Sequence, residues 1–200
     1  MTDNRDQLIT IARSIFDRGL THGSTGNVSV RDGDRILVTP TGSSLGTVTA
    51  DELAQIDLDG NPTGPNRPSK EGFLHAAILR ARPELNAVIH THSVHAAAVS
   101  CLPGLNTDSC LPPLTVYFEM RVGQLPLVPR FQPGDSAMSS AIEQTAATSH
   151  AMLLQNHGPV VAGATLQSAL DVLEEIEHTA QIYLLTQALE ARTEPAGWTR

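Results

Sequence analysis

The fold is decided by a short stretch in the middle of the chain, Ala87-Val-Ile-His90-Thr-His92. This stretch is apolar up to His90 and rich in β-branched residues, which predicts a buried strand that ends at the histidines. Because side chains alternate along a strand, His90 and His92 are expected to lie on the same face. Two parallel imidazoles supply half of the ligands that a metal site needs.

The segments before this strand predict helix, hairpin and helix in turn. Apolar residues at helical spacing predict an amphipathic helix over residues 5–19, and a loop of small residues at 21–27 leads into a β-hairpin with strands at 28–30 and 36–38. Residues 50–58 are expected to form a short helix or strand. Ser69 is expected to cap a helix that reaches about Ala81, with Glu71 in its first turn, where the helix dipole favours a carboxylate.

The segments after it continue the alternation. Residues 93–101 have helical character, 125–129 and 151–157 resemble strands, 135–149 fit a helix between those two strands, and 166–189 predict a long terminal helix. A chain of 200 residues suits one well-packed α/β domain, so residues 1–200 are expected to form a single domain.

Composition and charge restrict the partners of the chain. The net charge is −8 and the isoelectric point is near 5.4, which argues against nucleic-acid binding because that binding needs Lys and Arg against phosphates. No stretch approaches the roughly 18 apolar residues of a membrane span, and the polar start of the chain predicts no signal peptide. We therefore expect a cytoplasmic protein with no membrane partner, in which Cys101 and Cys110 are free thiols.

His157 and Glu71 are the other candidates for chemistry. His157 follows a strand-like run and precedes Gly158, which would let the backbone turn sharply and present the imidazole to a cleft. Three His ligands with one open position are typical of catalytic zinc. Glu71 could bind the metal when substrate is absent and act as acid or base when substrate is present. The alternatives are hydrogen-bonded structural histidines and a surface carboxylate at a helix start.

Two loops and one cation are candidates for anion binding. Gly26-Asn27 and Thr41-Gly42-Ser43 are rich in backbone amides and hydroxyls that suit phosphate oxygens, although such loops are often only turns. Lys70 would be either a solvated cation or an anion clamp.

Five motifs in order along nearly the whole chain resemble the class II aldolase and adducin-head family. They are Gly26-Asn-Val-Ser29, Thr39-Pro-Thr-Gly42, Pro68-Ser-Lys-Glu71, His90-Thr-His-Ser-Val-His95 and Asn156-His-Gly158. The resemblance implies that His90, His92 and His157 are metal ligands and that Glu71 is the acid/base residue, also near the metal. It implies that the phosphate pocket is lined by Gly26, Asn27, Thr41, Gly42, Ser69 and Lys70. Aldolases of this family commonly carry a second Ser where this chain has Lys70.

Further segments resemble the branch of this family that decarboxylates 3-oxo-tetronate 4-phosphate. They include residues 68–71, 101–105, 117–123, 126–129, 133–135 and 156–161. The resemblance implies a carbon–carbon lyase of four-carbon sugar-acid breakdown that forms dihydroxyacetone phosphate and CO2 through a metal-bound enediolate. Tyr117 lies in a segment that in the family reaches a neighbouring subunit's site, so its phenol is a candidate proton donor. The alternative is a packing tyrosine.

The resemblance further implies a three-layer α/β/α fold with a mostly antiparallel central sheet, a homotetramer, and one divalent cation per chain. Zinc suits three imidazoles, and manganese or cobalt would fit the same site. The alternative functions are a class II sugar-phosphate aldolase of the fuculose-phosphate type, an epimerase with the same enolate chemistry, and a non-catalytic interaction module like the adducin head.

Overall fold

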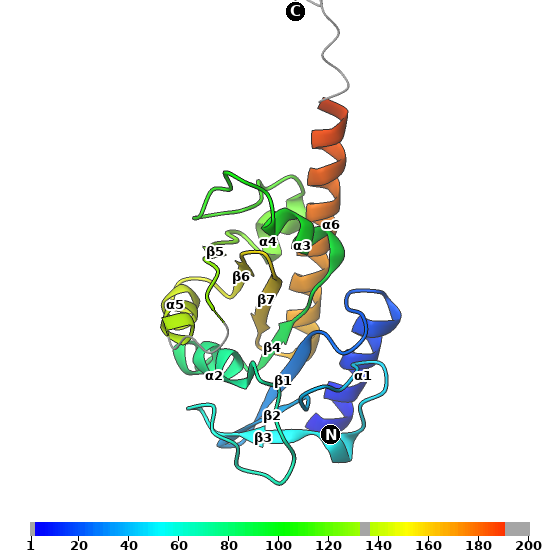
Figure 1. The fold of residues 1–200 in the computed structure, drawn as a ribbon, viewed down its shortest axis with the longest axis vertical. Coiled ribbons are helices and arrows are strands. Elements are labelled where there is room, and N and C mark those ends of the chain that lie inside the picture. The colour runs from blue at the N-terminus through cyan, green and yellow to red at the C-terminus, as the bar shows by residue number, and fades with distance from the viewer. Residues whose placement is uncertain (1–2, 133–136, 191–200) are drawn as a thin grey trace, which may run out of the picture.

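The computed structural model describes residues 3–132 and 137–190 and contains a seven-stranded sheet in the order β3-β2-β1-β4-β7-β6-β5 (Figure 1). Its strands are β1 (Asn27–Asp32), β2 (Arg35–Val38), β3 (Ala54–Ile56), β4 (Ala87–His90), β5 (Leu127–Val128), β6 (Ala151–Leu154) and β7 (Gly158–Gly163). Every neighbouring pair is antiparallel except β5 and β6, which are parallel. The sheet is therefore mixed and mostly antiparallel, as the sequence predicted.

Helices cover both faces of the sheet and make the three layers (Figure 1). One face carries α2 (Gly72–Ala81) and α5 (Ala137–Ala146). The other carries α1 (Asn4–Asp17), α3 (Val94–Ser100), α4 (Val116–Arg121) and α6 (Leu166–Glu190). A 3-10 turn, η1 (Ala50–Glu52), precedes β3, so residues 50–58 form both a short helix and a strand. No helix in the described ranges combines the length and apolar character that crossing a membrane requires.

Alternation along β1 and β4 decides which side chains face the layer of α2. Val28 and Val30 are buried in the core on the side of α1 and α6, as are Ala87 and Ile89. Val88 is buried on the opposite side, against α2 and α5. Because side chains alternate, Asn27, Ser29 and His90 lie on the α2 side, and polar residues from two central strands meet the start of that helix.

The start of α2 corrects one expectation. Glu71 is the N-cap residue with φ −94° and ψ 11°, so it precedes the helix and does not lie in its first turn. The Ser69 hydroxyl accepts a hydrogen bond from the backbone N–H of Glu71 at 3.2 Å, and the backbone N–H of Gly72 donates to Ser69 O. Ser69 thus closes a turn two residues before the capping position, and the Glu71 side chain, which makes no capping hydrogen bond, points into the site.

Strand β7 was not predicted from the sequence. The residues after His157 were expected to form a turn, but β6 and β7 pair as an antiparallel hairpin through Leu154 and Gly158. Asn156, with φ 57°, makes the turn instead of Gly158. The predicted helix over 135–149 corresponds to α5, while its expected start at Asp135 lies outside the described residues.

Candidate metal centre and active site

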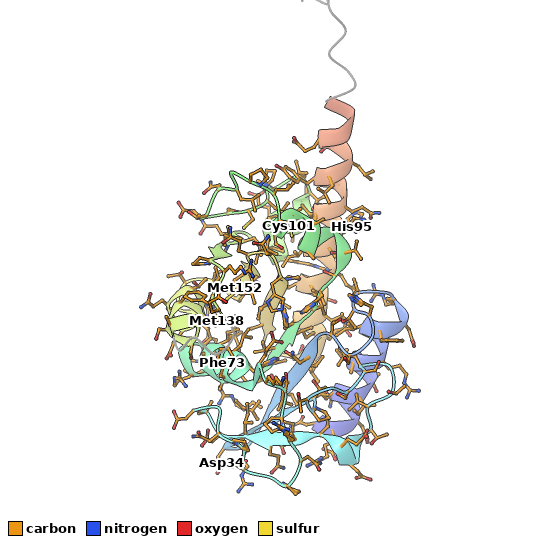
Figure 2. All side chains as sticks on the ribbon, viewed as in Figure 1. Asp34, Phe73, His95, Cys101, Met138 and Met152 are labelled. Carbon is orange, nitrogen blue, oxygen red and sulfur yellow. The ribbon has the colours of Figure 1, made fainter. Side chains whose placement is uncertain are left out.

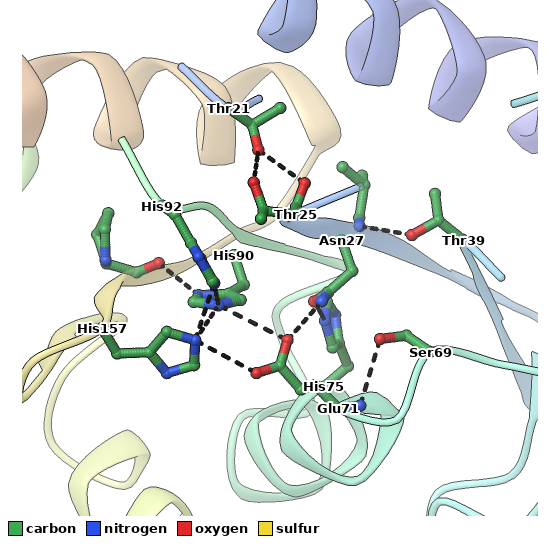
Figure 3. Close-up of polar contacts among 12 residues, drawn as sticks. Thr21, Thr25, Asn27, Thr39, Ser69, Glu71, His75, His90, His92 and His157 are labelled. Atoms are coloured by element: carbon green, nitrogen blue, oxygen red, sulfur yellow. Dashed lines mark hydrogen bonds and ion pairs between the residues drawn. The ribbon is translucent and has the colours of Figure 1, made fainter. Parts of the chain in front are cut away.

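Three histidines from two separate parts of the sheet meet at one point (Figure 3). His90 ends β4, His92 lies two residues beyond it, and His157 lies in the turn between β6 and β7. Their Nε2 atoms are 3.2 Å apart for His90 and His92, 3.2 Å for His90 and His157, and 2.8 Å for His92 and His157. The strand ends at His90, so His92 reaches the cluster from the loop and not through strand alternation as predicted.

The hydrogen bonding of His90 directs its free nitrogen toward the centre of the cluster. Its Nδ1 lies 2.9 Å from the carbonyl oxygen of Pro159, which can only accept, so Nδ1–H donates and Nε2 is the nitrogen that faces the cluster. Burial, followed by the proximity of His90, lowers the pKa of His92 and of His157 to about 4. Around neutral pH these two rings are therefore uncharged nitrogen donors, which metal binding requires.

The spacing of the three nitrogens fits a metal ion. A tetrahedral zinc with Zn–N bonds of about 2.0–2.1 Å holds its ligand atoms roughly 3.3 Å apart, close to the distances found here. One shared cation can bind all three nitrogens when each presents its lone pair. Within residues 3–132 and 137–190, this is the one cluster of three or more potential ligand residues.

Glu71 lies beside the three nitrogens and is partly open to solvent. Its carboxylate oxygens are 3.6 Å from Nε2 of His90 and 3.5 Å from Nε2 of His157, and 26% of its side chain is exposed. The amide nitrogen of Asn27 donates to Oε2 at 2.7 Å. Burial raises the pKa of Glu71, but His90 and the Asn27 hydrogen bond lower it, and the net change is downward. Glu71 is therefore an anion in its resting state.

Two glycines allow the backbone around this cluster to close up. A Cβ on Gly26, whose φ is 79°, would lie 2.9 Å from the carbonyl oxygen of His90. A Cβ on Gly158 would lie 2.2 Å from the carbonyl oxygen of Thr91. Gly158 is thus needed for close approach of β7 to the His90–His92 segment, and this role differs from the sharp turn that the sequence suggested.

The geometry agrees with comparisons to known proteins. The family model described as Class II Aldolase and Adducin N-terminal domain matches residues 6–184. This chain belongs to that family. The 3-oxo-tetronate 4-phosphate decarboxylase of Haemophilus influenzae is 40% identical over 195 residues, which cover 96% of this chain and 93% of that protein.

A solved structure and a second relative extend the comparison. YgbL from Klebsiella pneumoniae is 40% identical and superposes with a TM-score of 0.88, covering 90% of this chain and 88% of that one. The L-fuculose phosphate aldolase of Methanocaldococcus jannaschii is 37% identical over 183 residues, which cover 91% of this chain and 96% of that protein. The class II aldolase fold and the resemblance to decarboxylase lyases are thus both confirmed.

The loops predicted to bind phosphate lie next to the cluster but face a different hollow. The backbone N–H of Thr41 donates to Arg67 O and that of Ser69 donates to Thr39 O, so the two loops run side by side. Thr41 and Gly42 line a shallow depression with Asn66 and Arg67. Asn27 and Ser69 therefore contact Glu71 and Gly26 contacts the backbone of His90, whereas Thr41 and Gly42 line the separate depression.

Lys70 is exposed and does not line the depression formed by Thr41 and Gly42. It lines a cavity of about 570 Å³ together with Glu71 and His157, and the remaining wall is mostly apolar. Phe73 of α2 and Met138 of α5 contribute to this wall and lie on the same side of the sheet (Figure 2). Lys70 therefore shares a cavity with Glu71 and His157, whereas the Thr41 loop lines a separate depression.

Tyr117 is not brought to the site of its own chain. It lies on α4, 59% exposed, with the guanidinium of Arg121 5.3 Å from the centre of its ring. Val116 and Met120 beside it are more than 70% exposed.

His75 also lies at the site, although it was not among the site residues predicted from the sequence. It is fully buried on α2, and its Nε2 lies 2.5 Å from Oδ1 of Asn27. The spacing Glu71-x-x-x-His75 was the signal that could have revealed it, because residues four apart near a helix start lie on one face.

Proposed function

We propose that this chain is a metal-dependent carbon–carbon lyase that decarboxylates 3-oxo-tetronate 4-phosphate to dihydroxyacetone phosphate and CO2. The observation that carries the proposal is the convergence of three imidazole nitrogens beside the Glu71 carboxylate. This cluster lies in a chain 40% identical to a decarboxylase of that substrate.

His90, His92 and His157 would hold one divalent cation, and Glu71 would complete its shell when substrate is absent. Three imidazoles favour zinc, and manganese or cobalt would suit the same donors. When bound, the cation would polarise the C3 carbonyl and C2 hydroxyl oxygens of the substrate. Metal analysis of the purified protein would identify the ion.

The reaction requires the protein to transfer protons at two atoms, the C2 oxygen and C2. The bond between C1 and C2 breaks, CO2 leaves, and the electron pair moves to C2 and the C3 oxygen as an enediolate. Glu71, anionic at rest and partly exposed to the cavity, is suited to take the proton of the C2 hydroxyl while the C1–C2 bond breaks and to return it to the same oxygen afterwards. A second proton must reach C2, and the product is then dihydroxyacetone phosphate.

We assign the delivery of that second proton to Tyr117 of a neighbouring copy. Its exposure on α4 leaves its hydroxyl free to approach another chain, and a phenol O–H can donate a proton. Assembly as a homotetramer and a cytoplasmic location remain predictions from the sequence.

Substrate anions would bind at the two edges of the site. Gly26, Asn27, Thr41, Gly42 and Ser69 would receive the phosphate through backbone amides, a side-chain amide and hydroxyls. Lys70 would act as an anion clamp from the cavity edge.

A sugar-phosphate aldolase is the second candidate, favoured by the 37% identity to an L-fuculose phosphate aldolase. The two reactions share the enediolate and differ in the group that leaves. A non-catalytic interaction module is disfavoured by the intact set of three histidines and Glu71.

Incubation of zinc-loaded protein with freshly prepared 3-oxo-tetronate 4-phosphates and, in parallel, with fuculose 1-phosphate separates these candidates. We expect dihydroxyacetone phosphate and CO2 in equal amounts from the oxo acid, above the spontaneous rate and above the rate with the Glu71→Gln variant. Aldehyde and dihydroxyacetone phosphate from fuculose 1-phosphate alone would assign the aldolase function instead.

A further inference from the structure

A chain of hydrogen bonds runs through the interior from Ser29 to Glu71. The hydroxyl of Ser29 lies 2.7 Å from Nδ1 of His75. Nε2 of His75 lies 2.5 Å from Oδ1 of Asn27, and Nδ2 of Asn27 lies 2.7 Å from Oε2 of Glu71. Figure 3 shows the last two contacts, with His75 and Asn27 adjacent to Glu71. Ser29 and His75 are fully buried and Asn27 is 5% exposed, so water does not replace these partners.

The direction of this chain follows from the orientation of the Asn27 amide. Its Nδ2 donates to Oε2 of Glu71, so its oxygen faces His75 and accepts from Nε2. His75 must then carry its hydrogen on Nε2 and accept from Ser29 at Nδ1. Burial lowers the pKa of His75 to about 3, with a further contribution from His90, so the ring has a single hydrogen at neutral pH. The reverse direction would place two acceptor oxygens 2.7 Å apart with no hydrogen between them.

Glu71 depends on this arrangement because little else orients its carboxylate. As the N-cap residue of α2 it makes no capping hydrogen bond with its side chain. Asn27 is its one hydrogen-bond donor among the described residues apart from the imidazole nitrogens at 3.5 and 3.6 Å. An asparagine amide has nearly the same shape when rotated by half a turn, so only its partners decide which end faces Glu71.

We propose that His75 is a positioning residue, which accepts from Ser29, donates to Asn27, and so directs the Asn27 amide to hold the Glu71 carboxylate toward the cavity. The role links three elements. Asn27 of β1 pairs with His90 of β4 in the strand register, and Glu71 is the N-cap of α2, four residues before His75. The proposal rests on the proposed function of Glu71 as acid/base, but the hydrogen-bond chain can be observed without substrate.

Two conservative variants separate this role from simple packing. Glutamine places a donor near the position of Nε2, so His75→Gln keeps the donation to Asn27 and loses the contact with Ser29. Asparagine reaches only to the position of Nδ1, so His75→Asn keeps the contact with Ser29 and loses the donation to Asn27. Both remove similar bulk from the same buried position, which makes each a control for the other.

We expect His75→Gln to keep kcat within about threefold of the wild type, and His75→Asn to lose on the order of tenfold to a hundredfold in kcat, the scale of a misplaced catalytic group. KM and zinc content should change less than twofold in both. Leu79→Ala, a fully buried change on the same helix, should lower the melting temperature while leaving kcat near normal. A loss of kcat that follows the loss of melting temperature across all three variants would overturn the positioning role.

A spectroscopic measurement tests the chain independently of turnover. Histidine-selective 15N labelling of the zinc-loaded protein, with His75 assigned by its absence in His75→Gln, reports which ring nitrogen carries hydrogen. We expect hydrogen on Nε2 and a bare Nδ1 at pH 7. Hydrogen on Nδ1, or a charged ring, would overturn the proposed chain even if decarboxylase activity were found. The expected form would still support it if the substrate proved to be a different sugar phosphate.

Discussion

Glu71 and Glu177 both lie next to histidines, but the two carboxylates differ in how many hydrogen bonds they accept. Glu177 of α6 accepts from the backbone N–H and Nδ1 of His95 through Oε1, at 2.9 and 2.7 Å, and from the backbone N–H of Ala96 through Oε2 at 2.9 Å. It thereby caps α3, and only 13% of its side chain is exposed. Figure 2 shows His95 on α3 beside α6.

Glu71 receives one amide donor and faces a cavity with the rest of its carboxylate. Proximity of a carboxylate to a histidine therefore does not identify a catalytic pair. A better indication is a carboxylate with unoccupied acceptor sites beside an open cavity, because a group that transfers protons must be able to exchange hydrogen-bond partners. The predictions below test whether this difference separates function at Glu71 from stability at Glu177.

The largest effect is expected at the metal ligands. His92→Ala removes one of the three converging nitrogens, so the protein should lose its bound divalent cation and all measurable activity. The purified wild type should contain about one ion per chain by elemental analysis. A fully active, metal-free protein would contradict the whole assignment of this region.

Glu71→Gln and Glu177→Gln form a matched pair. Glu71→Gln should keep the fold and most of the metal but lower kcat about a hundredfold or more, the scale of a lost general acid or base. Glu177→Gln should lower the free energy of unfolding by about 1–3 kcal/mol, because a cap acceptor becomes a donor that faces an N–H group. Its kcat should be close to normal.

Calorimetry and steady-state kinetics on both variants check this pair. Equal losses of activity in the two variants would show that the comparison between the two glutamates is not a guide to function.

Tyr117→Phe removes one hydroxyl from an exposed ring on α4. If that hydroxyl serves the site of a neighbouring copy, kcat should fall roughly tenfold to a hundredfold with KM and melting temperature little changed. Steady-state kinetics together with the oligomeric mass from light scattering would measure both aspects. Normal turnover would return Tyr117 to the role of a packing residue.

Acidification should weaken the metal-free protein through the buried imidazole of His75. Its pKa is lowered to about 3 in the folded state from 6.5, so between these values the unfolded chain binds a proton that the folded chain does not. Stability therefore falls as pH falls, by about 1.4 kcal/mol for each pH unit from one such group. Urea unfolding at pH 7, 6 and 5 should show a smaller loss of stability in His75→Gln than in the wild type.

The smallest effect is expected at Lys70, which is the only lysine in the sequence. Lys70→Ser should raise KM about two- to fivefold, the scale of an exposed charge contact, with kcat nearly unchanged. Reductive methylation of the wild type should modify only this side chain and the N-terminal amine, and bound substrate should slow it at Lys70. Unchanged KM would refute the anion clamp and weaken the case for a decarboxylase over an aldolase.

Local patterns in the sequence were sufficient for most of the elements. Helical spacing predicted α1, α3 and α6, and the small-residue turn predicted the hairpin of β1 and β2. They failed at β7, because Gly158 and Pro159 are poor strand formers that tertiary packing placed in the middle of the sheet. The sequence pattern also placed Glu71 inside α2. Ser69 is a residue type that commonly caps helices, but here it forms the turn that precedes α2.

The side chains that can bind a metal and transfer a proton were identifiable from the sequence: two histidines at a strand end, a third before a glycine, and a glutamate at a helix start. Only the tertiary structure decided that the Nε2 atoms of His90 and His157, 67 residues apart, come within 3.2 Å, and that Asn27 and His75 orient Glu71. The difference arises because sequence patterns are local, whereas the site joins residues from distant elements. Spacing along a chain reports contacts within one element, whereas the register of β1, β4 and β7 and the docking of α2 on the sheet set the distances between elements.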